Sequence, residues 1–257
     1  MRRTWIALWA AAACVGSPAA QWATGSPLAY TLAPGVLALA MWAGRRLTRA
    51  EMGLSAPSPA GIALALFTPC AVAAVLAFAA GLMGQLHPAE VPLAAVAQMA
   101  GMSFAVTFVL ALLTEDGFFR GALWGGCRRA GLSAFGALAL TSAAFAAWHI
   151  AAAAMIPDFE VPPAWRAVYI GNMLLAGVIF GLLRMISGSL LAPALAHAAW
   201  NTLAYGLFGH GADPGLLGIA DIGLLDPERG LAGLAVNALA VGALFHIARR
   251  RHMGGAA

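Results

Sequence analysis

The chain has 257 residues, of which 62% are hydrophobic and only 9% are charged. Soluble domains carry roughly a quarter charged residues, so there are too few charges here to build the polar shell of a water-soluble domain. The composition therefore predicts one membrane domain over residues 1–257. The net charge is +4, but no basic patch with interleaved aromatic residues occurs, which argues against nucleic acid as a partner.

A membrane-spanning helix needs about 20 mostly apolar residues. In chain order, the sequence predicts such helices at residues 4–21, 28–43, 60–83, 93–115 with a helical continuation to about 127, 132–155, 166–184, 189–208 and 230–248. The expected fold is an all-α, polytopic membrane helical bundle with about eight transmembrane helices. Residues 1–50 would form N-terminal spans, 51–208 a core, and 209–257 an outer loop and the last span. Because the second segment is short and the last is rich in Ala and Gly, seven spans are the alternative.

The charges near the span ends predict an orientation, because basic residues favour the cytoplasmic side. If the first of eight spans begins on the cytoplasmic side, every Arg except Arg166 and Arg229 lies on the cytoplasmic side. Both termini would then be cytoplasmic, and the basic residues, all Arg, together with the short loops favour a bacterial inner membrane. The acidic residues of the outer loops would be Glu90, Asp158, Glu160, Asp213, Asp221, Asp226 and Glu228. A cleaved signal peptide at the N-terminus is an alternative reading of the first span.

The first unusual polar group lies in the fourth apolar segment, in the run Thr114-Glu115-Asp116-Gly117-Phe118-Phe119-Arg120-Gly121. Ionisable groups at membrane depth cost roughly 2.5–3.5 kcal/mol on insertion scales, so each is a functional candidate. In a helix, Asp116 and Arg120 are four residues apart and can pair on one face. Glu115 is rotated by about 100° and stays free to act as a general base. The alternative is that both acids only neutralise Arg120.

Two further polar groups lie in later spans. The fifth segment contains Phe145-Ala-Ala-Trp148-His149, and the seventh contains His197-Ala-Ala-Trp200-Asn201. A lone His in a span is usually a packed or hydrogen-bonding residue, whereas the spacing of His197 and Asn201 puts both on one helix face. A rise of about 1.5 Å per residue allows the acid and both His residues to meet near the middle or inner half of the bilayer.

In this order, the three motifs resemble the CPBP family, the intramembrane proteases related to type II CAAX prenyl endopeptidases and to bacteriocin-processing and self-immunity proteins. The family pattern is Glu-Glu-x-x-x-Arg, Phe-x-x-x-His and His-x-x-x-Asn. Here the motifs run from Glu115 to Arg120, from Phe145 to His149 and from His197 to Asn201, with Asp116 in place of the second Glu. The resemblance extends over residues 50–205, including the loop Met52-Gly53-Leu54.

The resemblance implies an intramembrane endopeptidase in which Glu115 activates a water that His149 helps to hold. His197 and Asn201 would donate to the developing oxyanion, and Asp116 and Arg120 would support the site. The aromatic residues Phe145 and Trp148 would line the substrate cavity. The resemblance implies no cofactor, and the partners would be membrane lipids and a peptide or protein substrate, lipidated or not.

Two alternatives remain open on the sequence. The first is a zinc-dependent membrane protease, because Glu115, His149 and His197 are an acceptable set of metal ligands, although no His-Glu-x-x-His motif is present. The second is a non-enzymatic protein, either a proton-coupled transporter or an immunity or scaffold protein, because buried acids and His residues also serve proton relay. The lack of an internal repeat argues against a transporter.

Overall fold

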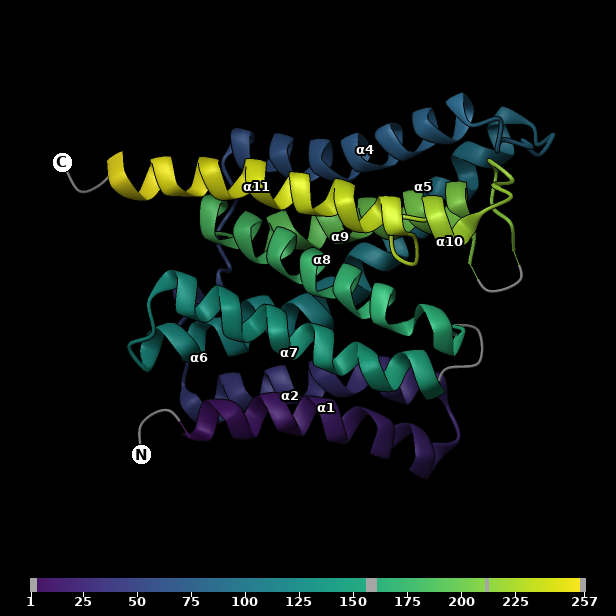
Figure 1. The fold of residues 1–257 in the computed structure, drawn as a ribbon. Coiled ribbons are helices and arrows are strands. Elements are labelled where there is room, and N and C mark those ends of the chain that lie inside the picture. The colour runs from purple at the N-terminus through teal and green to yellow at the C-terminus, as the bar shows by residue number, and fades with distance from the viewer. Residues whose placement is uncertain (1–3, 156–160, 211–212, 255–257) are drawn as a thin grey trace.

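The structure, a computed structural model, describes residues 4–155, 161–210 and 213–254, and within these ranges the regular elements are helices (Figure 1). The longer helices are α1 (Thr4–Thr24), α2 (Pro27–Arg45), α4 (Pro59–Leu82), α5 (Leu93–Leu113), α7 (Ala134–Met155), α8 (Arg166–Ser187), α9 (Leu191–Leu203) and α11 (Leu231–Gly254). The shorter ones are α3 (Arg49–Met52), η1 (Gly117–Leu123), α6 (Trp124–Arg129), η3 (Pro163–Trp165), η4 (Ala204–Phe208) and α10 (Ile222–Leu225).

A helix occurs at every segment where the sequence predicted a span, so the predicted all-α polytopic bundle is confirmed. Six helical segments in the described ranges are long and apolar enough to cross a membrane: Pro27–Arg45, Pro59–Leu82, Leu93–Arg129, Ala134–Met155, Pro163–Ser187 and Leu231–Arg251. The helices α1 and α9 are not among them. α9 has only 13 residues before it continues into η4, and the run Gly16-Ser17-Pro18 and Gln21 make α1 less apolar.

The helices are arranged around α9. α9 packs against α4, α5 and α8, while α7 and α11 pack on α8 and α1 packs along α2. In Figure 1 the α1–α2 pair and the α4–α11 pair lie on opposite sides of the bundle, with α7, α8 and α9 between them. Most residues of α9 from Ala192 to Trp200 are buried, including His197. The seventh predicted segment therefore forms the centre of the molecule.

The fourth predicted span continues as a helical segment to Arg129, as expected, but it is not one regular α-helix. α5 ends at Leu113, Thr114 adopts φ −114° and ψ −90°, and η1 that follows is a π-helix. The Thr114 hydroxyl donates to the Leu110 carbonyl at 2.7 Å, and Gly117 and Gly121 lower the propensity for a regular α-helix. π-Helical turns frequently occur at functional sites, and this one carries Arg120.

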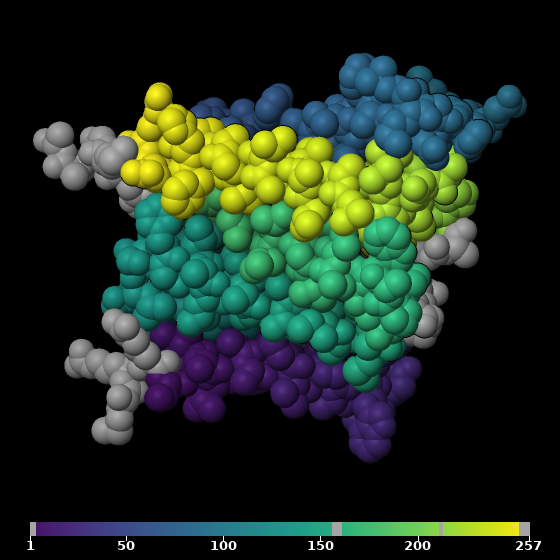
Figure 2. Space-filling view, viewed as in Figure 1, coloured from purple at the N-terminus to yellow at the C-terminus, as the bar shows by residue number. Residues whose placement is uncertain are grey.

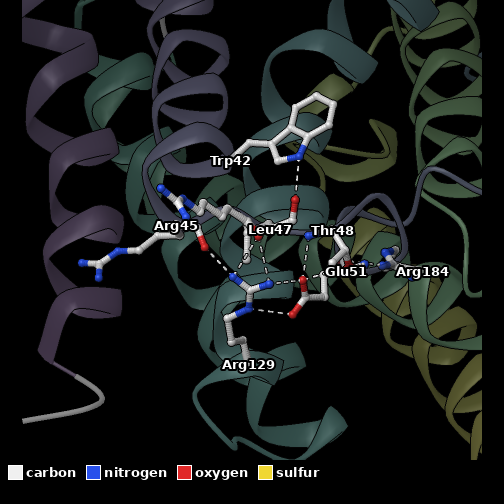
Figure 3. A network of polar contacts seen from close by, with 8 residues as sticks. Trp42, Arg45, Leu47, Thr48, Glu51, Arg129 and Arg184 are labelled. Atoms are coloured by element: carbon white, nitrogen blue, oxygen red, sulfur yellow. Dashed lines mark hydrogen bonds and ion pairs between the residues drawn. The ribbon is translucent and has the colours of Figure 1, made fainter.

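The hairpin between α2 and α4 is tied to the end of α6 by a polar network (Figure 3). Thr48 and Glu51 form a reciprocal cap at the start of α3, which satisfies backbone donors that a helix start leaves free. The Arg129 guanidinium donates its Nε to Glu51 at 2.7 Å and also binds the carbonyls of Arg45 and Arg46. Arg129 thereby holds the pKa of the Glu51 carboxyl below its usual range.

Arg184 connects the same hairpin to the π-helix. Its Nε donates to the Arg120 carbonyl at 3.1 Å and its Nη2 to the Glu51 carbonyl at 3.2 Å. Gly53 at the end of α3 has a positive φ of 77°, and a Cβ there would lie 2.5 Å from the Arg184 guanidinium. The glycine of the Met52-Gly53-Leu54 loop therefore permits both the turn and the close approach of Arg184.

The outer surface exposes large apolar side chains. Phe67 and Phe78 on α4 are each 69% exposed, and Leu93 on α5 is 82% exposed. The space-filling view shows α4 and α11 together at one edge of the molecule and α1 with α2 at the other (Figure 2). Such a surface would be an aggregation hazard in water, but it matches a lipid environment, in agreement with a multi-pass membrane protein.

Candidate active site

All four predicted catalytic residues and both predicted cavity residues line a single cavity of about 380 Å³. The cavity lies between the N-terminal end of α2, the segment after α5, and helices α7, α8 and α9. Its lining residues are Pro27, Leu28, Thr31, Glu115, Phe145, Trp148, His149, Ala152, Met173, Ala176, Phe180, His197, Trp200, Asn201, Tyr205 and Glu228. Elements that are far apart in the sequence thus bring the three motifs together.

The two adjacent acids have different surroundings, as the helical spacing predicted. Asp116 is fully buried behind the cavity, and its Oδ1 lies 3.4 Å from Nη1 of the fully buried Arg120. Glu115 lines the cavity. Its Oε2 is buried and has no hydrogen-bond partner within the described part of the chain. Glu115 is therefore the acid of this pair that is placed to act on a bound molecule.

Arg120 is held by aromatic rings as well as by Asp116. Its guanidinium carbon lies 4.1 Å from the centre of the Phe145 ring and 5.2 Å from that of Phe180. Its Nη2 donates to the Gly177 carbonyl on α8 at 3.4 Å. Attraction between a cation and an aromatic face is strongest when the cation is shielded from water. Arg120 consequently connects η1, α7 and α8 directly behind the cavity.

The structure adds a contact that the sequence reading missed, between Asp116 and His197. Nδ1 of His197 lies 3.0 Å from Oδ2 of Asp116, and the imidazole stacks on Phe180 with ring centres 4.9 Å apart. A carboxylate bound to one ring nitrogen orients the imidazole and leaves the other nitrogen for chemistry. The second acid therefore contacts both Arg120 and a predicted catalytic His.

His149 is oriented by its own helix. Its Nδ1 lies 2.8 Å from the Phe145 carbonyl oxygen one turn earlier in α7. Because a carbonyl only accepts, Nδ1 must carry the hydrogen of this bond, and in the neutral ring Nε2 then holds the free lone pair. The neighbouring Trp148 is fixed by Ser17 of α1, whose hydroxyl accepts from the indole N–H at 2.8 Å. The helix pair α1–α2 thus supports one wall of the cavity.

The residues Glu115, His149 and His197 do not form a metal-binding group in this geometry. No set of three His, Cys, Asp or Glu side chains spaced to hold a metal ion occurs among residues 4–155, 161–210 and 213–251. The Nδ1 atoms of both His residues already bind Phe145 and Asp116. Bonds of this kind to Nδ1 leave Nε2 of each ring available to a metal, so the zinc alternative stays a prediction that treatment with a chelator tests.

Glu228 also lines the cavity, although the sequence reading placed it among the outer-loop charges. Its side chain is 7% exposed, and Oε1 accepts from Trp200 Nε1 at 2.9 Å. The pKa of this carboxyl is raised to about 7, mainly by burial and also by repulsion from Asp226, while the Trp200 N–H, Arg229 and His197 act in the opposite direction. No local pattern marks Glu228, because its burial depends on how the chain before α11 packs against α9.

The fold and this cavity define the class of the protein: it is a multi-pass membrane protein with acid, imidazole and amide side chains around an internal site. Residues 97–203 match the family model described as Type II CAAX prenyl endopeptidase Rce1-like. This segment contains all three motifs, so the resemblance stated from the sequence is confirmed. The match supports a CAAX-protease-like intramembrane endopeptidase, and hence a hydrolase. No curated protein matches the chain.

Proposed function

We propose that the protein is an intramembrane endopeptidase in which Glu115 activates the attacking water. The observation that carries this proposal is the convergence of Glu115, His149, His197 and Asn201 on one cavity, with Asp116 and Arg120 held behind it. The match over residues 97–203 supports the reaction class. The substrate is a peptide segment that enters from the lipid or the membrane surface, with or without a lipid group.

In the proposed reaction, Glu115 removes a proton from a water while the oxygen of that water attacks the carbonyl carbon of the peptide bond. The Nε2 lone pair of His149 accepts a hydrogen bond from the same water and orients it. The C–N bond then breaks, and the proton held by Glu115 passes to the leaving amine. The products are a peptide with a new carboxyl group and a peptide with a new amino group.

His197 and Asn201 lie one helical turn apart on α9 and supply the donors for the oxyanion. The Asn201 amide donates directly, and Asp116 stabilises the protonated His197 ring, in which Nδ1–H binds Asp116 and Nε2–H donates to the oxyanion. Preorganised donors of this kind are worth about 3–4 kcal/mol each in known hydrolases. The apolar walls formed by Phe145, Trp148 and Phe180 limit water and strengthen these interactions.

The test is hydrolysis of a quenched-fluorescent peptide library, including prenylated peptides, by the purified protein in detergent. In Glu115→Gln the amide keeps the shape but cannot take a proton, so we expect kcat to fall by about 10²–10⁴-fold. His197→Ala should also lose activity. Glu90→Gln is the matched control, because Glu90 is exposed and lies outside the cavity, and it should keep full activity.

Three other results of this experiment would contradict parts of the proposal. Hydrolysis that survives in Glu115→Gln would refute the role given to Glu115. Activity that is lost with a chelator and restored by zinc would favour a metal-dependent protease instead. If the wild type hydrolyses no peptide of the library, the non-enzymatic alternative gains support, and proton-flux measurements would test it.

A further inference from the structure

The cavity contains a second acid that the proposed mechanism does not use. Glu228 lies on the segment between α10 and α11, and it lines the same cavity as Glu115 and His197. Among the described residues, the cavity lining includes two carboxyl groups and no Arg, the chain has no Lys, and the His197 imidazole is already bound by Asp116. A charged group in such an apolar enclosure is unfavourable unless an opposite charge binds it.

The segment that carries Glu228 is a rigid turn. Oδ1 of Asp226 accepts from the backbone N–H groups of Glu228 at 2.8 Å and of Arg229 at 2.7 Å. Asn237 on α11 donates to the Pro227 carbonyl at 2.9 Å and to the Asn172 side chain at 2.8 Å. These bonds fix the backbone on both sides of Glu228, and the bond from Trp200 orients its carboxyl.

The nearest cation in the sequence does not neutralise Glu228. The Arg229 guanidinium binds Oδ2 of Asp226 at 2.7 Å and the Gly209 carbonyl at 2.9 Å. Among the ion pairs of the described residues, none involves Glu228. Among the described residues, one side chain donates to Glu228, the neutral indole of Trp200, and a carboxylate can accept several more donors.

We propose that Glu228 forms a subsite of the cavity that binds a cationic side chain, lysine or arginine, of the peptide substrate. The inference rests on the proposed function, because it assigns a substrate feature to the same cavity. The cation would enter an apolar enclosure of Trp200, Tyr205 and Phe180 and pair with the Glu228 carboxylate. An ion pair shielded from water in this way selects strongly against a neutral side chain of the same shape.

A purely structural role for Glu228 makes a different prediction. If the carboxyl served only to accept from Trp200, a glutamine would replace it, because its amide oxygen accepts the same bond. Glu228→Gln therefore keeps that bond and removes only the charge. This substitution separates recognition of a cation from support of Trp200.

The experiment compares pairs of peptides that differ only by arginine or its neutral isostere citrulline at one position near the cleavage site. At the position where the preference is largest, we expect kcat/KM of the wild type to be about 10-fold or more higher for the arginine peptide than for the citrulline peptide. A factor of 10 corresponds to about 1.4 kcal/mol. In Glu228→Gln the ratio should fall to about 1, and in Glu90→Gln it should stay as in the wild type. The wild-type ratio should rise from pH 6 to pH 8, because the carboxyl with a pKa of about 7 becomes ionised while arginine stays charged.

Binding is measured separately so that the two proposals can fail independently. Fluorescence anisotropy of labelled arginine and citrulline peptides with Glu115→Gln, and with Glu115→Gln/Glu228→Gln, requires no hydrolysis. A preference for arginine in the single variant that disappears in the double variant supports the subsite even if no peptide is cleaved. Equal binding of both peptides by the single variant, or a preference that persists without Glu228, would overturn it.

Discussion

At the scale of single residues, the adjacent acids Glu115 and Asp116 have similar chemistry but different positions and partners. Glu115 lines the cavity, while Asp116 pairs with Arg120 at 3.4 Å and with His197 at 3.0 Å. Asp stands where the family pattern has a second Glu, and its shorter side chain still reaches both partners. A buried charge is tolerated here because each partner supplies part of the neutralisation.

Removing the cation of this group should destabilise the protein strongly. In Arg120→Leu, Asp116 keeps only His197, and the contacts with Phe145 and Phe180 are lost. Breaking a buried pair on one side costs about 3–5 kcal/mol, which unfolding in a sodium dodecyl sulfate titration would measure. Arg128→Leu is the control, because Arg128 is exposed on α6, and it should change stability by less than about 1 kcal/mol. Equal losses for the two variants would contradict the role given to the buried cation.

At the scale of elements, the break after α5 places the first motif. α2 approaches this break so closely that a Cβ on Gly35 would lie 2.8 Å from the Leu113 carbonyl oxygen. Only a glycine permits this contact without a shift of the backbone. The position of the segment carrying Glu115 therefore depends on the packing of α2 against it.

Gly35→Ala should disturb the site without changing any polar residue. The added methyl group must push α2 away from the end of α5, at a cost of about 1–3 kcal/mol, and the displacement of Glu115 should lower kcat. Gly44 lies on the same helix with nothing within 4 Å of its Cβ position, so Gly44→Ala should be neutral or stabilise by up to about 1 kcal/mol. Thermal unfolding and peptide hydrolysis of both variants check this. Wild-type activity in Gly35→Ala would show that α2 does not position the acid.

At the scale of the whole molecule, α1 begins and α11 ends at the same end of the bundle (Figure 1). The hairpin between α2 and α4, with Arg45, Arg46 and Arg49, belongs to the connections that the sequence assigns to the cytoplasmic side. This orientation remains a prediction from the distribution of Arg residues. It would place Glu228 on a connection that enters the bundle from the opposite side.

Reporter fusions test the orientation directly. Green fluorescent protein should fluoresce when fused to either terminus, because it folds in the cytoplasm, and alkaline phosphatase should be active when inserted next to Glu90 in the connection between α4 and α5. The reverse pattern would show that the whole bundle is inverted. A signal peptide that is removed would appear as loss of the N-terminal fusion with the C-terminal one unchanged.

Three features of the protein were predictable from its amino-acid sequence: the membrane environment, the helical fold and the three motifs. Composition settles the first, because so few charged residues cannot cover a soluble domain. The pairing of Asp116 with Arg120 was predictable, since it follows from a spacing of four residues. The four residues predicted to be catalytic and the two predicted to line the substrate cavity all line the same cavity in the structure.

Contacts between residues that are far apart in the chain became visible in the folded structure alone. The bond between Asp116 and His197 joins residues 81 positions apart, and the entry of Glu228 into the cavity depends on Trp200 and on Asn237. The packing of α2 against η1 likewise joins elements that are separate in the sequence. Sequence patterns report the periodicity within one helix, whereas these features arise from how separate helices pack, which no local pattern encodes.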